Sequence, residues 1–124
     1  MAEEITASAS LSVDNGIVSS KLAKVGLSVD LAGSDFTHQS QNAATGEAAL
    51  DLGKITTPGW FLGINRSTTA AEIIEIRTQT GAAYDTIKIE PGEFACFRFG
   101  SNATAPYIIS ASGPPTLEYL LVED

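Results

Sequence analysis

The chain has 124 residues, one cysteine and a formal net charge of −8, from fifteen acidic and seven basic residues. The length suits one domain, the single cysteine excludes an intrachain disulfide framework, and the acidity disfavours nucleic acid and anionic membranes as partners. The residues Met1–Thr6 have neither the basic nor the apolar region of a signal peptide. No apolar run approaches the roughly 20 residues of a membrane-spanning helix.

The first segment alternates apolar and hydroxyl side chains, with Ile5, Leu11 and Val13 among the apolar positions. A period of two predicts a strand over residues 5–13 that has one apolar face. Asp14-Asn15-Gly16 is typical of a turn. Residues 17–22 could form the returning strand, and residues 25–31 alternate again.

The middle of the chain is less regular. Residues 36–44 are polar and could form an exposed edge strand or a loop. Residues 43–52 contain Ala and Glu, but glycines at 46 and 53 bracket the segment, so we expect one helical turn at most. The residues Thr56-Thr57-Pro58-Gly59 predict a turn.

The second half is a series of short apolar segments, each closed by a turn signal. β-Branched and aromatic residues at this spacing predict an all-β sandwich or barrel. Between two of the segments, Glu90-Pro91-Gly92-Glu93 suits a type II turn. We expect one antiparallel β-sandwich over residues 1–124, jelly-roll-like, with about eight to ten strands. The expected strands are residues 59–65, 72–78, 86–90, 94–99, 107–110 and 117–122.

Three of these segments, residues 60–64, 94–99 and 117–122, are apolar on both faces. A strand of this kind must be covered twice, by a second layer or by a partner. The N-terminal strands could supply the cover, and so could another protein; both alternatives stay open. The interaction candidates are Ile5, Leu11, Val13, Trp60, Phe61, Phe97 and Leu120.

Residues able to do chemistry are few. His38 lacks neighbouring metal ligands, and nothing in the sequence brings it to Cys96. Glu90 and Glu93 flank an exposed turn, where a raised pKa is not expected. Asp14, Asn15, Asp30 and Asp35 could hold a structural calcium ion, but their spacing is not that of an EF-hand. We therefore expect no enzyme, no cofactor and no metal.

Four blocks follow one another along the chain: Leu50–Phe61, Ile87–Ala95, Ala105–Tyr107 and Leu117–Asp124, the last of which ends acidic. Together these blocks resemble small β-sandwich structural proteins of tailed bacteriophages. The resemblance lies in the order of these blocks and implies a virion component made in the bacterial cytoplasm. It supplies no catalytic residue. Head decoration is the favoured role in the virion, and a location in the tail or at the fibre base is the alternative.

The implied partners are copies of the chain itself, as a homo-oligomer, and the major capsid protein or other virion proteins. Residues 1–13 could act as an N-terminal arm, or as an exchanged strand that pairs with a neighbour's sheet edge. The alternative function is receptor binding through carbohydrate. It would use aromatic side chains as a stacking platform, although aromatics at alternating strand positions are more often core. The platform candidates are Trp60, Phe61, Tyr84, Tyr107 and Tyr119.

Overall fold

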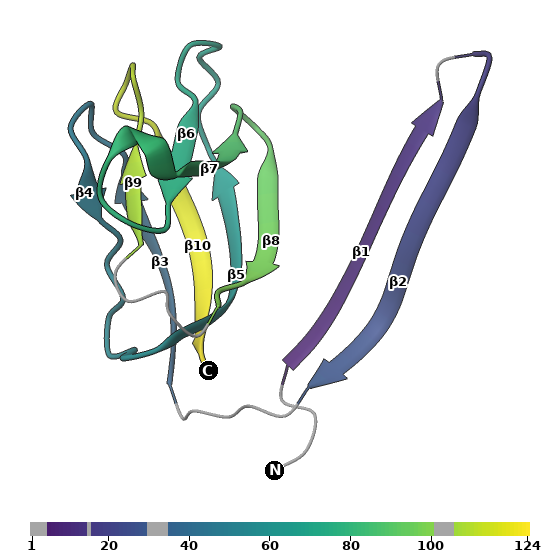
Figure 1. The fold of residues 1–124 in the computed structure, drawn as a ribbon, viewed down its shortest axis with the longest axis horizontal. Coiled ribbons are helices and arrows are strands. Elements are labelled where there is room, and N and C mark those ends of the chain that lie inside the picture. Colours follow the sequence, from purple (N-terminus) through teal and green to yellow (C-terminus); the bar gives the residue numbers. More distant parts are fainter. Residues whose placement is uncertain (1–4, 15, 30–34, 101–105) are drawn as a thin grey trace. The chain divides into compact units, whose positions relative to one another are not determined.

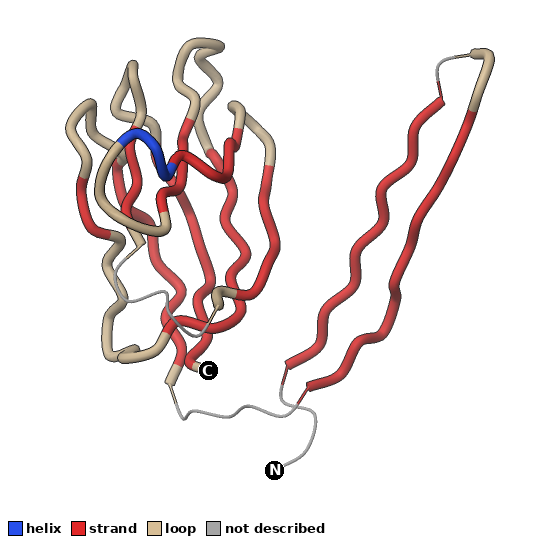
Figure 2. Tube along the Cα trace, viewed as in Figure 1, coloured by secondary structure: helices blue, strands red, loops and turns tan. Residues whose placement is uncertain are grey.

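The computed structural model describes residues 5–14, 16–29, 35–100 and 106–124. The described chain is built of antiparallel strands, with one short 3₁₀ turn, η1 (Ala82–Tyr84) (Figures 1 and 2). The strands are β1 (Ile5–Asp14), β2 (Ser19–Val29), β3 (Phe36–Asn42), β4 (Ala48–Ala49), β5 (Pro58–Asn65), β6 (Ile74–Arg77), β7 (Asp85–Ile89), β8 (Phe94–Arg98), β9 (Tyr107–Ile109) and β10 (Thr116–Glu123).

The chain divides into two compact units, Met1–Ala32 and Gly33–Asp124. In the first unit β1 and β2 pair only with each other, as a two-stranded antiparallel sheet. The sequence predicts one sandwich over residues 1–124. Instead, both sheets of the sandwich are built from strands after residue 35. The single strand β2, Ser19–Val29, spans most of the two segments predicted at 17–22 and 25–31, of which residues 30 and 31 lie outside the described residues.

The second unit contains two four-stranded sheets, in the orders β3-β10-β5-β8 and β4-β9-β6-β7. Four of the strand pairs are nested along the chain: β3 with β10, β4 with β9, β5 with β8, and β6 with β7. Nested pairs spread over two sheets are what an eight-stranded jelly roll needs. The all-β sandwich expectation is confirmed, and its jelly-roll form stays a prediction.

The two sheets share one apolar core, which explains their stacking (Figure 1). The first sheet contributes Phe61 and Tyr119, and the second contributes Ile76 and Ile108. Alternate residues of each strand enter this core, as the period of two requires. The buried hydrophobic residues are Ala43, Leu50, Ile55, Phe61, Ile74, Ile76, Ile89, Phe99, Ile108, Leu117, Tyr119 and Leu121.

Most sequence-predicted strands of the second half are present within a residue or two of their expected limits. Residues 36–44, for which the sequence allows either an edge strand or a loop, contain the edge strand β3. The predicted turn at Pro91-Gly92 is also present: Gly92 has a φ of 82°, and the Glu93 amide donates to the Glu90 carbonyl. Residues 43–52 hold the two-residue strand β4 where one helical turn at most was expected.

Candidate interaction surfaces

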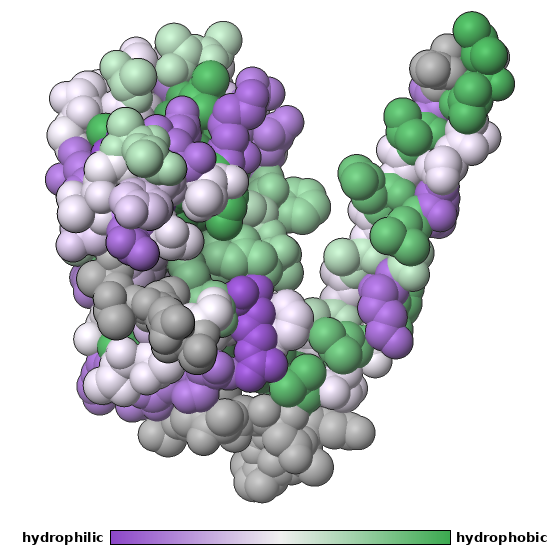
Figure 3. All heavy atoms as spheres, viewed as in Figure 1, coloured by the Kyte–Doolittle hydropathy of each residue, from purple (hydrophilic) through white to green (hydrophobic). Residues whose placement is uncertain are grey.

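The β1-β2 hairpin is amphipathic. Its register places Leu11 opposite Leu22 on one face, and Ser12 opposite Lys21 on the other. The apolar face also carries the pairs Ile5–Val29 and Ala7–Leu27, and the polar face carries Thr6–Ser28 and Ser10–Ala23. Leu11 and Leu22 are 78% and 81% exposed, so an exposed apolar strip lies on this face (Figure 3). Lys24, opposite Ala9, and Ser20, opposite Val13, interrupt the strip. The described residues of this unit therefore have a largely apolar face but form no core of their own.

A β-bulge interrupts the hairpin between Ala7 and Ala9. Gly26 lies at this point with a φ of 71°, and its amide donates to Ser8 Oγ at 3.1 Å. A glycine with positive φ is the usual way to add one residue to a strand. The bulge lets Leu22, Leu27 and Val29 lie on the same face, although a strict period of two would separate Leu22 from Leu27.

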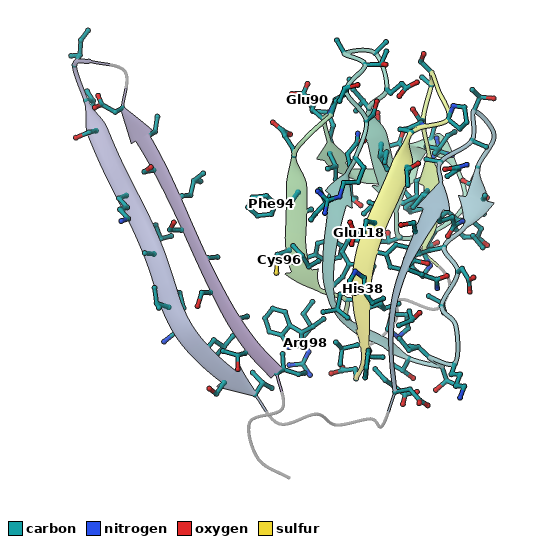
Figure 4. All side chains as sticks on the ribbon, turned by 180° about the vertical axis from the view of Figure 1, so that it is seen from behind. His38, Glu90, Phe94, Cys96, Arg98 and Glu118 are labelled. Atoms are coloured by element: carbon teal, nitrogen blue, oxygen red, sulfur yellow. The ribbon has the colours of Figure 1, made fainter. Side chains whose placement is uncertain are left out.

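The outward side of sheet β3-β10-β5-β8 carries the second apolar surface. Leu120, Leu62 and Cys96 lie side by side across three neighbouring strands, and Ile64 and Phe94 form the next row. Figure 4 shows Phe94 and Cys96 projecting from β8 away from the core. Leu62 and Leu120 are 38% and 39% exposed, and Phe94 is 66% exposed. We call this surface the outer apolar face: Phe36, Trp60, Leu62, Ile64, Phe94, Cys96, Leu120 and Val122.

Two ion-pair groups lie on the same outward side as the outer apolar face, and Glu118 is opposite Ile64. Glu118 accepts hydrogen bonds from His38 Nε2 at 2.8 Å and Arg66 Nε at 2.8 Å. The hydrogen bonds from His38 and then Arg66 hold the pKa of the Glu118 carboxyl below its usual range. At another edge Arg98 pairs with Asp124, and its guanidinium carbon lies 6.0 Å from the Trp60 ring centroid. Both carboxylates are thus neutralised locally.

The outward side of the other sheet differs, because a charged network covers part of it. Arg77 is buried on β6 and pairs with Glu47 at 2.7 Å and with Asp85. Glu47 also accepts hydrogen bonds from Thr80 and from the Gly81 amide. These bonds hold the loop that follows β6 against the residue that precedes β4. Every guanidinium contact is internal, so the network is a structural clamp rather than an open anion site.

The network perturbs its carboxyl groups in opposite directions. Hydrogen bonds from Thr80, Gly81 and Arg77 lower the pKa of Glu47 to about 2. The hydrogen bond from Arg77 likewise lowers the pKa of Asp85. Burial, followed by the charge of Asp85, raises the pKa of Glu75. The clamp is therefore held together by Glu47 and Asp85 in their ionised forms.

The interaction candidates from the sequence separate into surface and core. Trp60 and Leu120 lie on the outer apolar face, and Leu11 and Val13 lie exposed on the hairpin. Phe61 is buried, and Phe97 is half-buried and packs against the core, so neither is available to a partner. Ile5 is half-buried on β1. Leu62, Ile64 and Phe94 are not among the candidates from the sequence, although Leu62 and Ile64 alternate in phase with Trp60.

The candidate catalytic residues do not come together. His38 and Cys96 lie in one row of the sheet, on the edge strands β3 and β8. Three strand spacings separate them, about 14 Å, which is too far for a nucleophile and its base. The Glu93 carboxylate accepts a hydrogen bond from the Glu90 amide at 3.2 Å, which stabilises the turn.

The candidate ligand sites also lack a convergent set of groups. Of the calcium candidates, Asp14 accepts the Gly16 amide at 2.9 Å, and Asn15 and Asp30 lie outside the described residues. Within the described ranges, no three His, Cys, Asp or Glu residues are placed to hold a metal ion. A cavity of about 390 Å³ lies beside Arg66 and Pro115, where Ser67 is hydrogen-bonded to Glu72.

The five aromatics proposed as a sugar platform lie on different surfaces. Phe61 and Tyr119 are core residues, and Trp60 belongs to the outer apolar face. Tyr84 lies in η1 and Tyr107 on β9, in the other sheet. A stacking platform needs its rings side by side on one accessible surface, so no specific observation favours carbohydrate binding.

Comparison with protein-family models, with curated proteins and with solved structures finds no match for this chain. Among the described residues there is no helix of the length and apolarity that crossing a membrane requires. The surfaces described above are therefore the basis on which a function can be argued.

Proposed function

We propose that the protein is a structural subunit of a tailed-bacteriophage virion, with head decoration as its favoured station. It binds copies of itself and neighbouring virion proteins through exposed apolar surfaces, and it performs no catalysis. The observation that carries the proposal is the amphipathic β1-β2 hairpin, whose apolar face has no core within its own unit.

Physical considerations favour a partner for the hairpin. An isolated two-stranded hairpin is marginally stable in water, because it buries too little apolar surface to offset its conformational entropy. Strands of ten and eleven residues are long for such an element. A chain that carries this hairpin gains stability when another surface covers Leu11, Leu22 and Leu27.

The virion assignment has a separate support, in the order of blocks from Leu50–Phe61 to Leu117–Asp124. The nested strand order of the sandwich favours its jelly-roll form. A head-decorating subunit needs only to adhere, so the mechanism is burial of apolar area. Burial of apolar surface stabilises the assembly by about 25 cal/mol per Å², before the free-energy costs of association are deducted.

The test replaces Leu11 and Leu22 by serine in the full chain, since they face each other on the apolar strip. Light scattering measures the mass of this variant and of the control T6S/S28T, in which two paired residues of the polar face change places. We expect the control to assemble like the unaltered chain and the L11S/L22S variant to lose mass. Equal masses for all three would contradict assembly through the hairpin.

The virion station needs a second measurement. Electron microscopy of native particles that contain the chain should show many copies on a surface lattice. Six or twelve copies at one vertex would instead favour the tail or fibre-base alternative, and absence from purified particles would contradict the virion proposal itself.

A further inference from the structure

The two outward sides of the sandwich have different chemistry. In sheet β4-β9-β6-β7 the outward positions of β6 are Glu75 and Arg77, and Lys88 lies opposite Glu75. In sheet β3-β10-β5-β8 the outward positions of β5 are Trp60, Leu62 and Ile64, none of which is charged. The outward side of sheet β3-β10-β5-β8 is therefore apolar along β5, with His38, Glu118 and Arg98 beside it on the neighbouring strands.

Charge also bears on whether this side can meet another copy of the same chain. At a net charge of −8 two copies repel each other, and the repulsion is least where the carboxylates are already paired. On the outer apolar face Glu118 is paired with His38 and Arg66, and Asp124 is paired with Arg98. Two such faces can approach without bringing unpaired carboxylates of these groups together.

The flat area of the face is somewhat smaller than the area that a standard interface buries on each partner. Four strands about 4.8 Å apart and up to eight residues long give a flat area of roughly 500 Å², and projecting side chains enlarge the accessible area. A standard interface buries about 800 Å² on each partner. Sheets stack face to face in this way about 10 Å apart, and a two-fold axis makes one patch serve both partners.

We infer that the outer apolar face docks against the same face of a second copy, which buries Leu62, Leu120, Ile64 and Phe94 in a two-fold sheet-on-sheet interface. The inference rests on the proposed assembly function and adds a surface distinct from the hairpin. The acidity of the chain disfavours an anionic lipid surface as the occupant.

Cys96 supplies a readout on the unaltered protein, because this exposed thiol lies in the same row as Leu62 and Leu120. Its rate of maleimide labelling is measured in the full chain over a range of protein concentrations. The inference predicts labelling at least about tenfold slower where dimers dominate, since only the unassociated fraction reacts.

The matched variants place lysine on either side of the sandwich. L62K/L120K should remain fast-labelling at every concentration and should not dimerise through this face. The control I109K, on the outward side of the other sheet opposite Glu75, should behave like the unaltered chain. Thermal unfolding monitored by circular dichroism checks that both variants are folded.

Three outcomes would overturn the inference. Labelling of Cys96 that stays fast while the mass rises would mean that association uses the hairpin alone, and the proposed function would survive. Shielding that is the same at every dilution would mean that cover comes from within one chain. Shielding of Cys96 that appears only after capsid shells are added would mean that a different virion protein binds the outer apolar face. Failure of the L11S/L22S test leaves the Cys96 result unaffected, so the two proposals can fail separately.

Discussion

Phe61 is the residue on which the sandwich core depends most. Its ring lies 5.0 Å from the Phe97 ring, 5.8 Å from Phe99 and 5.9 Å from Tyr119, measured between centroids. It also covers Gly63, where an added Cβ would lie 2.5 Å from Phe61 Cζ. The glycine in the middle of β5 is thus explained by the ring packed above it.

Replacing Phe61 by alanine removes this ring and leaves a cavity beside Gly63. We expect the free energy of unfolding to fall by about 3–5 kcal/mol, as for other buried phenylalanines. The matched control is F94A, which removes the same side chain from an exposed position on the neighbouring strand β8. It should change stability by about 0.5 kcal/mol or less when measured below the association range. Urea unfolding of both variants is the measurement, and equal losses would contradict the assignment of inner and outer faces.

Glu47 makes the fold sensitive to acid. Its pKa is lowered from 4.5 to about 2 in the folded chain, so the unfolded chain binds a proton more readily. The stabilisation from Glu47 is complete above about pH 4.5, the usual value, and is lost as the pH falls towards 2. The variant E47Q should be less stable at neutral pH and lose less stability between pH 4.5 and 2. The midpoints of urea unfolding, measured across this pH range, test this expectation. A larger loss of stability on acidification in E47Q than in the unaltered chain would contradict it.

At the scale of elements, the bulge at Gly26 sets the phase of the hairpin. A side chain at a φ of 71° is strained even though the space around it is open. We expect G26A to destabilise the hairpin by about 1 kcal/mol and to speed amide hydrogen exchange along β1 and β2. The control G46A lies in open space at a glycine without positive φ and should leave exchange unchanged. Unchanged protection in G26A would mean that the bulge does not hold the register.

Strand positions could be predicted from the sequence because the period of two survives in most segments. The continuity of β2 could not, since a bulge breaks the alternation at Gly26 and makes one strand look like two. The inner and outer faces of β5 were equally hard to assign. Trp60, Phe61, Leu62 and Ile64 are all apolar, and the register with Phe97 and Leu121 decides that Phe61 points inward.

At the scale of the whole molecule, the alternation in residues 5–13 predicts a buried face but cannot say what buries it. From the sequence, either the same sandwich or a partner could cover that face. The structure gives β1 and β2 a sheet of their own, and none of the buried core residues comes from these two strands. The same ambiguity applies to Leu62 and Leu120, because apolar composition does not distinguish core from interface.

Charge gives the whole molecule a dependence on salt. A net charge of −8 opposes association at low ionic strength, where the screening length is long. We expect association to strengthen severalfold as salt is raised from about 0.01 to 0.3 M, because apolar burial is retained while repulsion is screened. Sedimentation velocity at matched protein concentrations measures this. Association that weakens with salt would mean that ion pairs between copies hold the assembly.

The central claim is that uncovered apolar surfaces on this chain exist to bind other copies. Native mass spectrometry of the full, unaltered chain tests it most directly, because the technique counts chains in each complex. The account predicts complexes of two or more chains, and it predicts smaller complexes when Leu11 and Leu22 are replaced by serine. A spectrum containing single chains alone, at every concentration and salt condition, would contradict it.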